Sequence, residues 1–240
     1  MPTLIVDAGT GIRQVTSLMK GQAFRGTILL GHLHWDHVEG LPFFSAGDND
    51  DSIVRLVMPQ QGDAEEVLAR MMSPPFFPVS PAEMRGEWTF EGIEPGDYDI
   101  EGFHVKAVEI PHKGGRCFGY RISDGNKVIV YISDHSPTAR GPGEGGLGMI
   151  YDDVLDLACG ADVLLHDSQH TAREFPPVAH FGHATIEYSV ALARAAGVKR
   201  LLLFHHSPGR TDEQLEAIVS SVDGDGLVVE AAAEGTAIDL

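Results

Sequence analysis

The stretch His32-Leu33-His34-Trp35-Asp36-His37 decides the fold and the chemistry of this chain. Imidazoles and a carboxylate, the donors that zinc and similar divalent ions prefer, crowd into six consecutive residues. The stretch follows the apolar run Thr27–Leu30, which is typical of a buried strand. Strand alternation would point His32 and His34 the same way, and a turn after them would let Asp36 and His37 face a second ion. The pattern predicts a metal site at a strand end, and a polar loop with scattered histidines is the alternative.

The composition is that of a globular, strongly acidic protein. The chain has 240 residues, 43% of them hydrophobic, which is enough for one core and predicts a single domain over residues 1–240. The 17 basic and 35 acidic residues give a formal net charge of −18, which excludes a broad basic surface for nucleic acid. No apolar run approaches the roughly 20 residues of a membrane helix, and no secretory signal is seen at the start, so no membrane partner is expected.

Cysteine usage predicts the compartment. Cys117 and Cys159 are too few for a disulfide scaffold, so we expect a reducing cytoplasm. Cys117 precedes an apolar run and Cys159 ends a predicted helix, and we expect both to be buried and inert.

Apolar runs and helix-capping patterns alternate along the chain. The expected strands are Thr3–Val6, Thr27–Leu30, Ile53–Met58, Phe103–Ile110, Cys117–Ile132 with a turn at Ser123–Asn126, Asp162–Leu165 and Arg200–Phe204. The expected helices follow the caps Asp63 and Thr211 and cover Tyr151–Cys159 and Thr185–Ala196. This order predicts a mixed α/β layered domain whose polar groups gather where strands end.

The His-x-His-x-Asp-His pattern resembles the signature of the metallo-β-lactamase superfamily, and the longer run His32–Pro42 is similar to its ribonuclease Z and cyclic-phosphodiesterase branch. Six further stretches resemble that branch in order: Asp7–Gly11, Pro111-His112 with Phe118–Ile122, Ser133–His135, His166–Ser168, Gly182–Thr185 and Phe204–Pro208. The resemblance implies a four-layer αββα sandwich. Relatives generally have strands before the Asp-Ala-Gly strand, and this chain begins almost at it, so we expect those strands to be missing through truncation or in a compact variant.

The resemblance implies a site for two divalent ions, with zinc favoured and manganese as the alternative. One ion would be held by His32, His34 and His112, and the other by Asp36, His37 and His205, with Asp134 bridging them. Two ions roughly 3.5–4 Å apart can clamp the attacking and leaving oxygens of a displacement, and a hydroxide held between them would be the nucleophile. Asp36 would also orient that hydroxide.

A second implied feature is a general acid. His183 would protonate the leaving oxygen while Asp167 holds its imidazole, and the alternative is a helix-start histidine bound to backbone. Asp7 is expected to accept a hydrogen bond from a ligand imidazole or a turn amide. His104 is expected to be structural. No role is assigned to five other histidines: His135, His166, His170, His180 and His206.

The substrate follows from the branch and the charge. Asp134 at the bridging position is typical of phosphodiesterases, whereas β-lactamases carry Cys or Ser there. The acidic balance, and the lack of the basic arm of ribonuclease Z, favour a small phosphodiester, such as a cyclic nucleotide or ribosyl cyclic phosphate, over tRNA. The segment Met71–Val79, rich in Met, Phe and Pro, is a candidate pocket wall for a flat group, an ordinary packed loop or a homodimer contact.

Three alternative functions remain open at this point. A hydrolase of the same fold could act on a lactone, thioester or β-lactam, a tRNA 3′ processing endonuclease would use the same metal centre, and a non-catalytic metal-binding protein would keep the ligands alone. The complete set of seven donors favours an enzyme.

Overall fold

The computed structural model describes all 240 residues, which group into two compact units. The first unit holds Met1–Pro95 and Asp99–Gly102, and the second holds Gly96–Tyr98 and Phe103–Leu240. The expected single domain over residues 1–240 stays a prediction.

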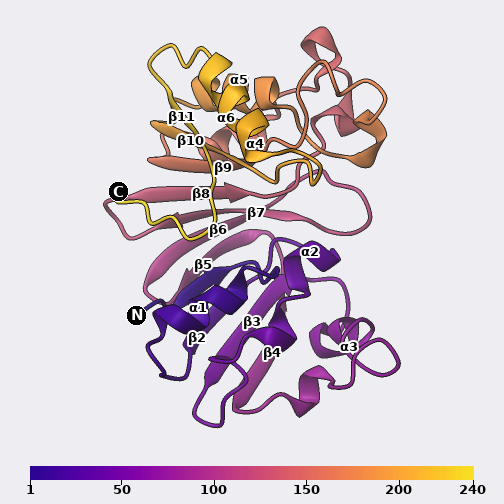
Figure 1. Cartoon of the computed structure of the whole chain (residues 1–240), viewed down its shortest axis with the longest axis vertical. Coiled ribbons are helices and arrows are strands. Elements are labelled where there is room, and N and C mark those ends of the chain that lie inside the picture. Colours follow the sequence, from indigo (N-terminus) through magenta and orange to yellow (C-terminus); the bar gives the residue numbers. More distant parts are fainter. The chain divides into compact units, whose positions relative to one another are not determined.

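A four-stranded parallel sheet organises the first unit (Figure 1). Its strands are adjacent in the order β1 (Leu4–Val6), β2 (Arg25–Leu29), β3 (Ile53–Pro59) and β4 (Glu87–Ile93). Three helices contribute to the core of this unit: α1 (Ile12–Leu18), α2 (Trp35–Val38) and α3 (Ala64–Ala69). Ile12, Val38 and Leu68 pack with buried Ile28 and Leu56 from the sheet. Burying these aliphatic side chains is what stabilises the unit.

A seven-stranded mixed sheet organises the second unit. Its order is β11 (Val228–Ala231), β10 (Arg200–Phe204), β9 (Val163–Asp167), β8 (Val128–Ile132), β7 (Phe118–Ser123), β6 (Phe103–Glu109) and β5 (Gly96–Ile100). Strands β8 to β11 run parallel, and β6 to β8 are antiparallel. Three helices lie together over this sheet: α4 (Asp152–Ala158), α5 (Ile186–Ala195) and α6 (Asp212–Ser221) (Figure 1).

Helix starts follow the expected caps. The Asp63 carboxylate accepts the Glu66 amide at 3.0 Å at the start of α3, and Thr185 accepts the Tyr188 amide at 3.1 Å at the start of α5. Thr211 and Gln214 form a reciprocal capping box at α6. Each cap satisfies an amide that the first helical turn leaves without a partner.

The parallel strands bring polar side chains to one edge of the second sheet. Ile132 pairs with His166, and Phe204 pairs with Asp167, so the carboxyl ends of β8, β9 and β10 coincide. Asp134, Asp167 and His205 therefore leave the sheet at neighbouring points. His205 has a positive φ of 55°, a conformation that costs a non-glycine residue energy and is found where function requires it.

The expected mixed α/β class is confirmed, with two sheets and six α-helices. Sequence reasoning missed α1, β4, β5 and β11, whose exposed faces weaken the apolar pattern. Two local expectations were wrong: β2 ends at Leu29, so His32 and His34 follow it in a loop, and Cys159 is exposed. Cys117 is buried as expected. None of the helices is both long and apolar enough to cross a membrane.

Candidate metal centre

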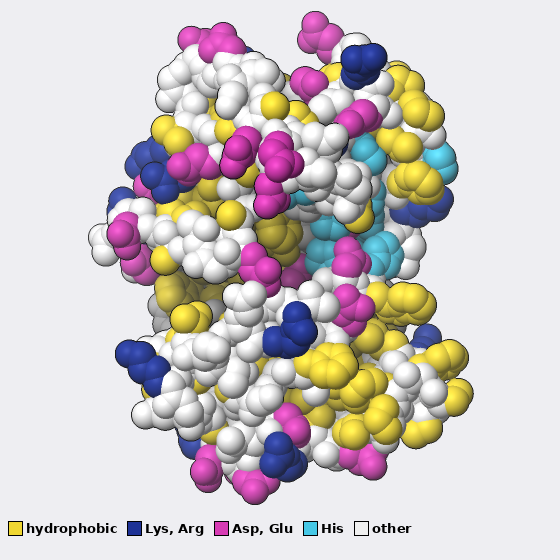
Figure 2. Space-filling model, viewed as in Figure 1, with side chains coloured by type: hydrophobic (Ala, Val, Ile, Leu, Met, Phe, Trp, Pro, Cys, Tyr) yellow, Lys and Arg dark blue, Asp and Glu magenta, His cyan; other side chains and the backbone are white.

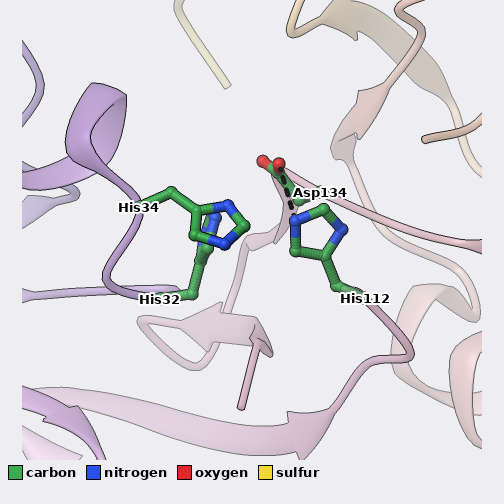
Figure 3. A group of neighbouring side chains, drawn as sticks. All are labelled: His32, His34, His112 and Asp134. Carbon is green, nitrogen blue, oxygen red and sulfur yellow. Dashed lines mark ion pairs between the residues drawn. The ribbon is translucent and has the colours of Figure 1, made fainter. Parts of the chain in front are cut away.

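The donors of the first unit lie on a tight turn after β2. His34 is extended, and the chain then enters α2 at Trp35, which folds Asp36 and His37 back beside the preceding loop. The ring centroid of His32 lies 4.5 Å from that of His34 and 4.1 Å from that of His37 (Figure 3 draws His32 and His34). His32 and His37 are buried, whereas the Asp36 side chain is 59% exposed. The turn, not strand alternation, gathers these imidazoles.

Asp7 fixes the orientation of His37. It follows β1 with a positive φ of 60°, and its Oδ1 accepts the Gly31 amide at 2.6 Å. Its Oδ2 lies 2.6 Å from His37 Nδ1. The carboxylate thus accepts a hydrogen bond from Nδ1–H, and a neutral ring held in this way has its lone pair on Nε2, the atom that can coordinate a cation. The expected hydrogen bonds of Asp7 are both present.

Asp134 is the centre of the second unit's donor set. It is 1% exposed, and its Oδ2 lies 3.4 Å from His112 Nε2, drawn as a dashed line in Figure 3. Its Oδ1 lies 3.6 Å from His205 Nε2, and its Oδ2 lies 3.7 Å from His183 Nδ1. Donor atoms of Asp134, His183 and His205 all lie within 4.8 Å of one another.

The hydrogen bond of His112 is compatible with a cation bound at this set. His112 Nδ1 donates to the Gly182 carbonyl at 2.9 Å, so the neutral ring has its lone pair on Nε2. With a neutral ring, that lone pair faces the Asp134 carboxylate, and the two repel unless a metal ion or a proton on Nε2 lies between them. Imidazole with carboxylate is also a donor set that divalent zinc accepts. Gly182 has φ +92°, a backbone conformation that other residues rarely adopt, so glycine suits this position.

His183 and Asp167 form a hydrogen-bonded pair beside Asp134. His183 Nδ1 lies 3.0 Å from Asp167 Oδ2, and the His183 side chain keeps 13% of its surface exposed. Asp167 is fully buried and also accepts the amides of His135 and Gln169 at 3.0 and 3.1 Å. Burial raises the pKa of Asp167, while the hydrogen bond from His183 acts in the opposite direction. The expected pairing is present, and the acid role of His183 stays a prediction.

Sequence reasoning missed the residues that hold His205. Its Nδ1 lies 3.0 Å from the side-chain amide of Gln169. The Gln169 carbonyl accepts a hydrogen bond from Arg210 at 3.1 Å, and Arg210 also pairs with Glu174 at 2.8 Å. No motif marks Gln169 or Arg210, although both lie within five residues of motif positions.

Two of the unassigned histidines, His135 and His166, form a buried pair next to Asp167. His135 Nδ1 lies 3.1 Å from His166 Nε2, and His166 Nδ1 lies 2.8 Å from Ser189 Oγ. Burial lowers the pKa of His135 well below its ordinary value, and a proton on nearby His166 would lower it further. Burial lowers the pKa of His166 to about 4. Both rings are therefore neutral at pH 7. The His135 amide donates to the Asp167 carboxylate, and His166 Nδ1 lies 2.8 Å from the Asp167 backbone carbonyl.

The other histidines lie at the edges of these loops. His170 pairs as an isolated bridge with Thr185, and its ring centroid lies 6.4 Å from that of His183. His180 is exposed and packs against Phe181. Burial lowers the pKa of His206, next to His205. His104 lies on β6, 3.2 Å from exposed Asp97, outside both donor sets.

Comparison with known proteins settles the family. The model of the "Beta-lactamase superfamily domain" matches residues 3–206. This chain belongs to that superfamily. Ribonuclease Z of Listeria innocua serovar 6a is 29% identical over 224 residues, covering 75% of this chain and 70% of that protein.

Solved structures agree on the fold. The metallo-β-lactamase fold protein YhfI from Bacillus subtilis superposes with a TM-score of 0.71 at 18% identity, covering 97% of this chain and 85% of that one. A diphosphatase of the PhnP family gives 0.68 at 18% identity, covering 99% and 79%. The expected metallo-β-lactamase-like fold and the superfamily are thus confirmed, and the chain is a metal-dependent hydrolase.

Proposed function

We propose that this chain is a dinuclear metal-dependent phosphodiesterase that acts on a small phosphodiester, a cyclic nucleotide or a ribosyl cyclic phosphate. The observation that carries the proposal is His112 Nε2 lying 3.4 Å from the Asp134 carboxylate, beside the His183–Asp167 pair. A metal ion would fit between the two groups of the first feature, and a proton can be delivered from the second.

The proposed centre uses the seven donors that the sequence predicts. His32, His34 and His112 would hold one ion, Asp36, His37 and His205 the other, and Asp134 would bridge them. Bound divalent ions, zinc before manganese, would neutralise phosphate charge and lower the pKa of a water molecule. Asp7 and Gly182 keep His37 and His112 in the tautomer that offers Nε2. The exposed Asp36 carboxylate would orient the attacking water.

His183 would supply the proton to the leaving oxygen. Asp167 accepts from His183 Nδ1, so a proton given up by the ring leaves from Nε2. Asp167 is fully buried, and its carboxylate keeps the His183 ring in one orientation. This arrangement is what a poor alkoxide leaving group requires.

A phosphodiester is favoured over a carbon ester by the proteins this chain is similar to. One is a ribonuclease Z and another a diphosphatase, and both names describe cleavage at phosphorus. Asp134 at the bridging position agrees with this choice. A lactone, thioester or β-lactam remains the competing class that the experiment below includes.

Processing of the tRNA 3′ end is a second candidate, favoured by the ribonuclease Z name of the relative. The formal net charge of −18 weighs against it, because affinity for polynucleotides comes mostly from cationic side chains that displace counterions. A small substrate with one phosphodiester makes no such demand.

Hydrolysis of bis-p-nitrophenyl phosphate by the zinc-loaded protein tests the proposal. Nitrocefin, a γ-lactone and an unprocessed tRNA are run beside it, with Asp134→Ala as the blank. We expect turnover of the phosphodiester that vanishes in the blank. Turnover of nitrocefin or the lactone alone would overturn the phosphodiesterase assignment, and tRNA cleavage at a higher kcat/KM would replace the small substrate by tRNA.

A further inference from the structure

An aromatic groove lies in the first unit, next to the metal-binding turn. It has a volume of about 420 Å³. Its lining comes from α2 and the following turn and from the end of α3 and the segment after it: Trp35, Glu39, Pro42, Phe43, Arg70, Met71, Met72, Phe76 and Phe77. Figure 2 shows hydrophobic side chains gathered over this part of the molecule, around α3. The volume falls in the range of roughly 300–1,000 Å³ that small-molecule pockets occupy.

The floor of the groove packs against the core, whereas two of its aromatic side chains are exposed. Met72 is buried in the core, and Phe77 packs against that core and edge-on to Phe43, with 5.7 Å between ring centroids. Trp35 and Phe76, by contrast, are 74% and 80% exposed. One exposed aromatic ring is ordinary, but several around one groove mark a binding surface.

Trp35 ties the groove to the metal donors. It is the first residue of α2, and Asp36 and His37 are the next two. Trp35 and Glu39 are four positions apart and so share a side of this turn, on which both line the groove. A molecule stacked on Trp35 is thereby held at a fixed distance from two of the proposed ligands.

We propose that this groove, formed by Trp35, Phe43 and Phe76, binds the nucleobase of a nucleotide phosphodiester. The inference rests on the proposed function, since the phosphate of the same molecule would lie at the metal donors. Flat bases stack on aromatic side chains, each stack contributing roughly 1–3 kcal/mol. Arg70 and Glu39 are exposed and offer one donor group and one acceptor group to the edge of a base. A ribosyl cyclic phosphate without a base would leave the rings uncovered.

The lining also argues against other occupants. A polyanion would meet a single cation, Arg70, in the groove. A second copy of this chain would bury the exposed rings, and this outcome is separated from base binding in the test. Binding of a base in this groove would make nucleotides the preferred substrates among small phosphodiesters.

The first test is binding to the metal-free full-length protein, followed by tryptophan emission. The chain has two tryptophans, and Trp88 is half-buried against Phe90, so Trp35→Phe identifies the signal from the groove. We expect adenosine 5′-monophosphate to quench Trp35, while ribose 5-phosphate, which has the same phosphate and no base, does not. Phe76→Ser should raise the Kd for the nucleotide about tenfold, the equivalent of 1.4 kcal/mol. Leu18→Ala, which removes a 63% exposed side chain outside the groove, is the matched control.

The second test is turnover by the zinc-loaded protein. Thymidine 5′-p-nitrophenyl phosphate is compared with methyl p-nitrophenyl phosphate, and the ratio of their kcat/KM values should fall about tenfold in Phe76→Ser. Equal binding of nucleotide and ribose phosphate would overturn the inference, and so would an unchanged ratio. A wild-type dimer that Phe76→Ser makes monomeric, without nucleotide quenching, would make the groove a contact between copies.

The two proposals fail in different ways. Base-dependent quenching without turnover of any phosphodiester would leave the groove assigned and remove the proposed function. Phosphodiester turnover with no preference for a base would keep the function and remove the nucleobase site.

Discussion

Each unit of this hydrolase contains a histidine whose Nδ1 faces a carboxylate, and the two pairs differ in burial. In the first unit, His37 is 4% exposed and Asp7 lies 2.6 Å away. In the second, His183 keeps 13% of its side chain exposed and Asp167, 3.0 Å away, is fully buried. A buried imidazole on a partly exposed carboxylate suits a permanent ligand. A more exposed imidazole on a buried carboxylate suits proton transfer.

The largest expected effect is that of His183→Ala. Its dependence on the leaving group of the substrate distinguishes a proton donor from a metal ligand. His183→Ala should lower kcat about 10²–10⁴-fold for a phosphodiester with an alkoxide leaving group, because such a group needs a proton. The loss should be much smaller for p-nitrophenolate, which leaves without one. Steady-state kinetics on the two esters measures the difference, and bound zinc is counted alongside. An equal loss on both esters would assign His183 to metal binding, like His37.

Lowering the pH should destabilise the protein through His166, which is buried next to Asp167. The pKa of His166 is lowered by burial from its ordinary 6.5 to about 4, so the unfolded chain binds more protons in that interval. The stabilisation is therefore complete above about pH 6.5 and is lost as pH falls towards 4, by roughly 3 kcal/mol (about 2.5 pKa units at 1.36 kcal/mol each). Urea unfolding of metal-free protein from pH 7.5 to 4 measures it. His166→Asn should weaken the dependence of the unfolding free energy on pH. An unchanged dependence would show that His166 is not its cause.

The first pair is tested by Asp7→Asn. The amide offers His37 a weaker acceptor, and loss of such a partner typically lowers metal affinity 10–100-fold. Zinc competition with a chromophoric chelator measures the affinity. Asp63→Asn is the control, because Asp63 only caps α3. Unchanged zinc affinity in Asp7→Asn would show that Asp7 serves the Gly31 turn alone.

The smallest expected effect concerns the helix that follows His183. Thr185 caps α5, and Thr185→Ala should destabilise the protein by about 1 kcal/mol, while Thr185→Ser keeps the oxygen and most of the stability. Denaturant midpoints measure both. A serine variant as unstable as the alanine variant would assign the loss to packing of the buried methyl group instead of the cap.

Local chemistry accounts for what the sequence alone predicted. Strands such as Arg200–Phe204 are continuous apolar runs, and the caps Asp63, Thr185 and Thr211 mark helix starts, so these elements were expected. β4 and β11 lie at sheet edges and alternate between half-buried and exposed residues, so their apolar pattern is too weak to find.

The same distinction applies to the site: residues in local motifs could be predicted, and residues that act through distant contacts could not. The expected donors stand in recognisable motifs, so the sequence points to them, and their binding of metal stays a prediction. Gln169, Arg210 and Ser189 act through contacts between segments that are distant in sequence, such as Gln169 with His205, 36 residues away. No local pattern carries that information. The fold makes these contacts by bringing the ends of β8, β9 and β10 to one sheet edge.

Counting the ions bound per chain tests the central claim most directly. Protein saturated with zinc and freed of excess by gel filtration is analysed by elemental mass spectrometry, beside Asp134→Ala, His37→Ala and Leu18→Ala. The account predicts two ions in the wild type and in Leu18→Ala, and one or none in the other two variants. A wild type that holds a single ion, or an Asp134→Ala variant that keeps two, would contradict a dinuclear centre bridged by Asp134.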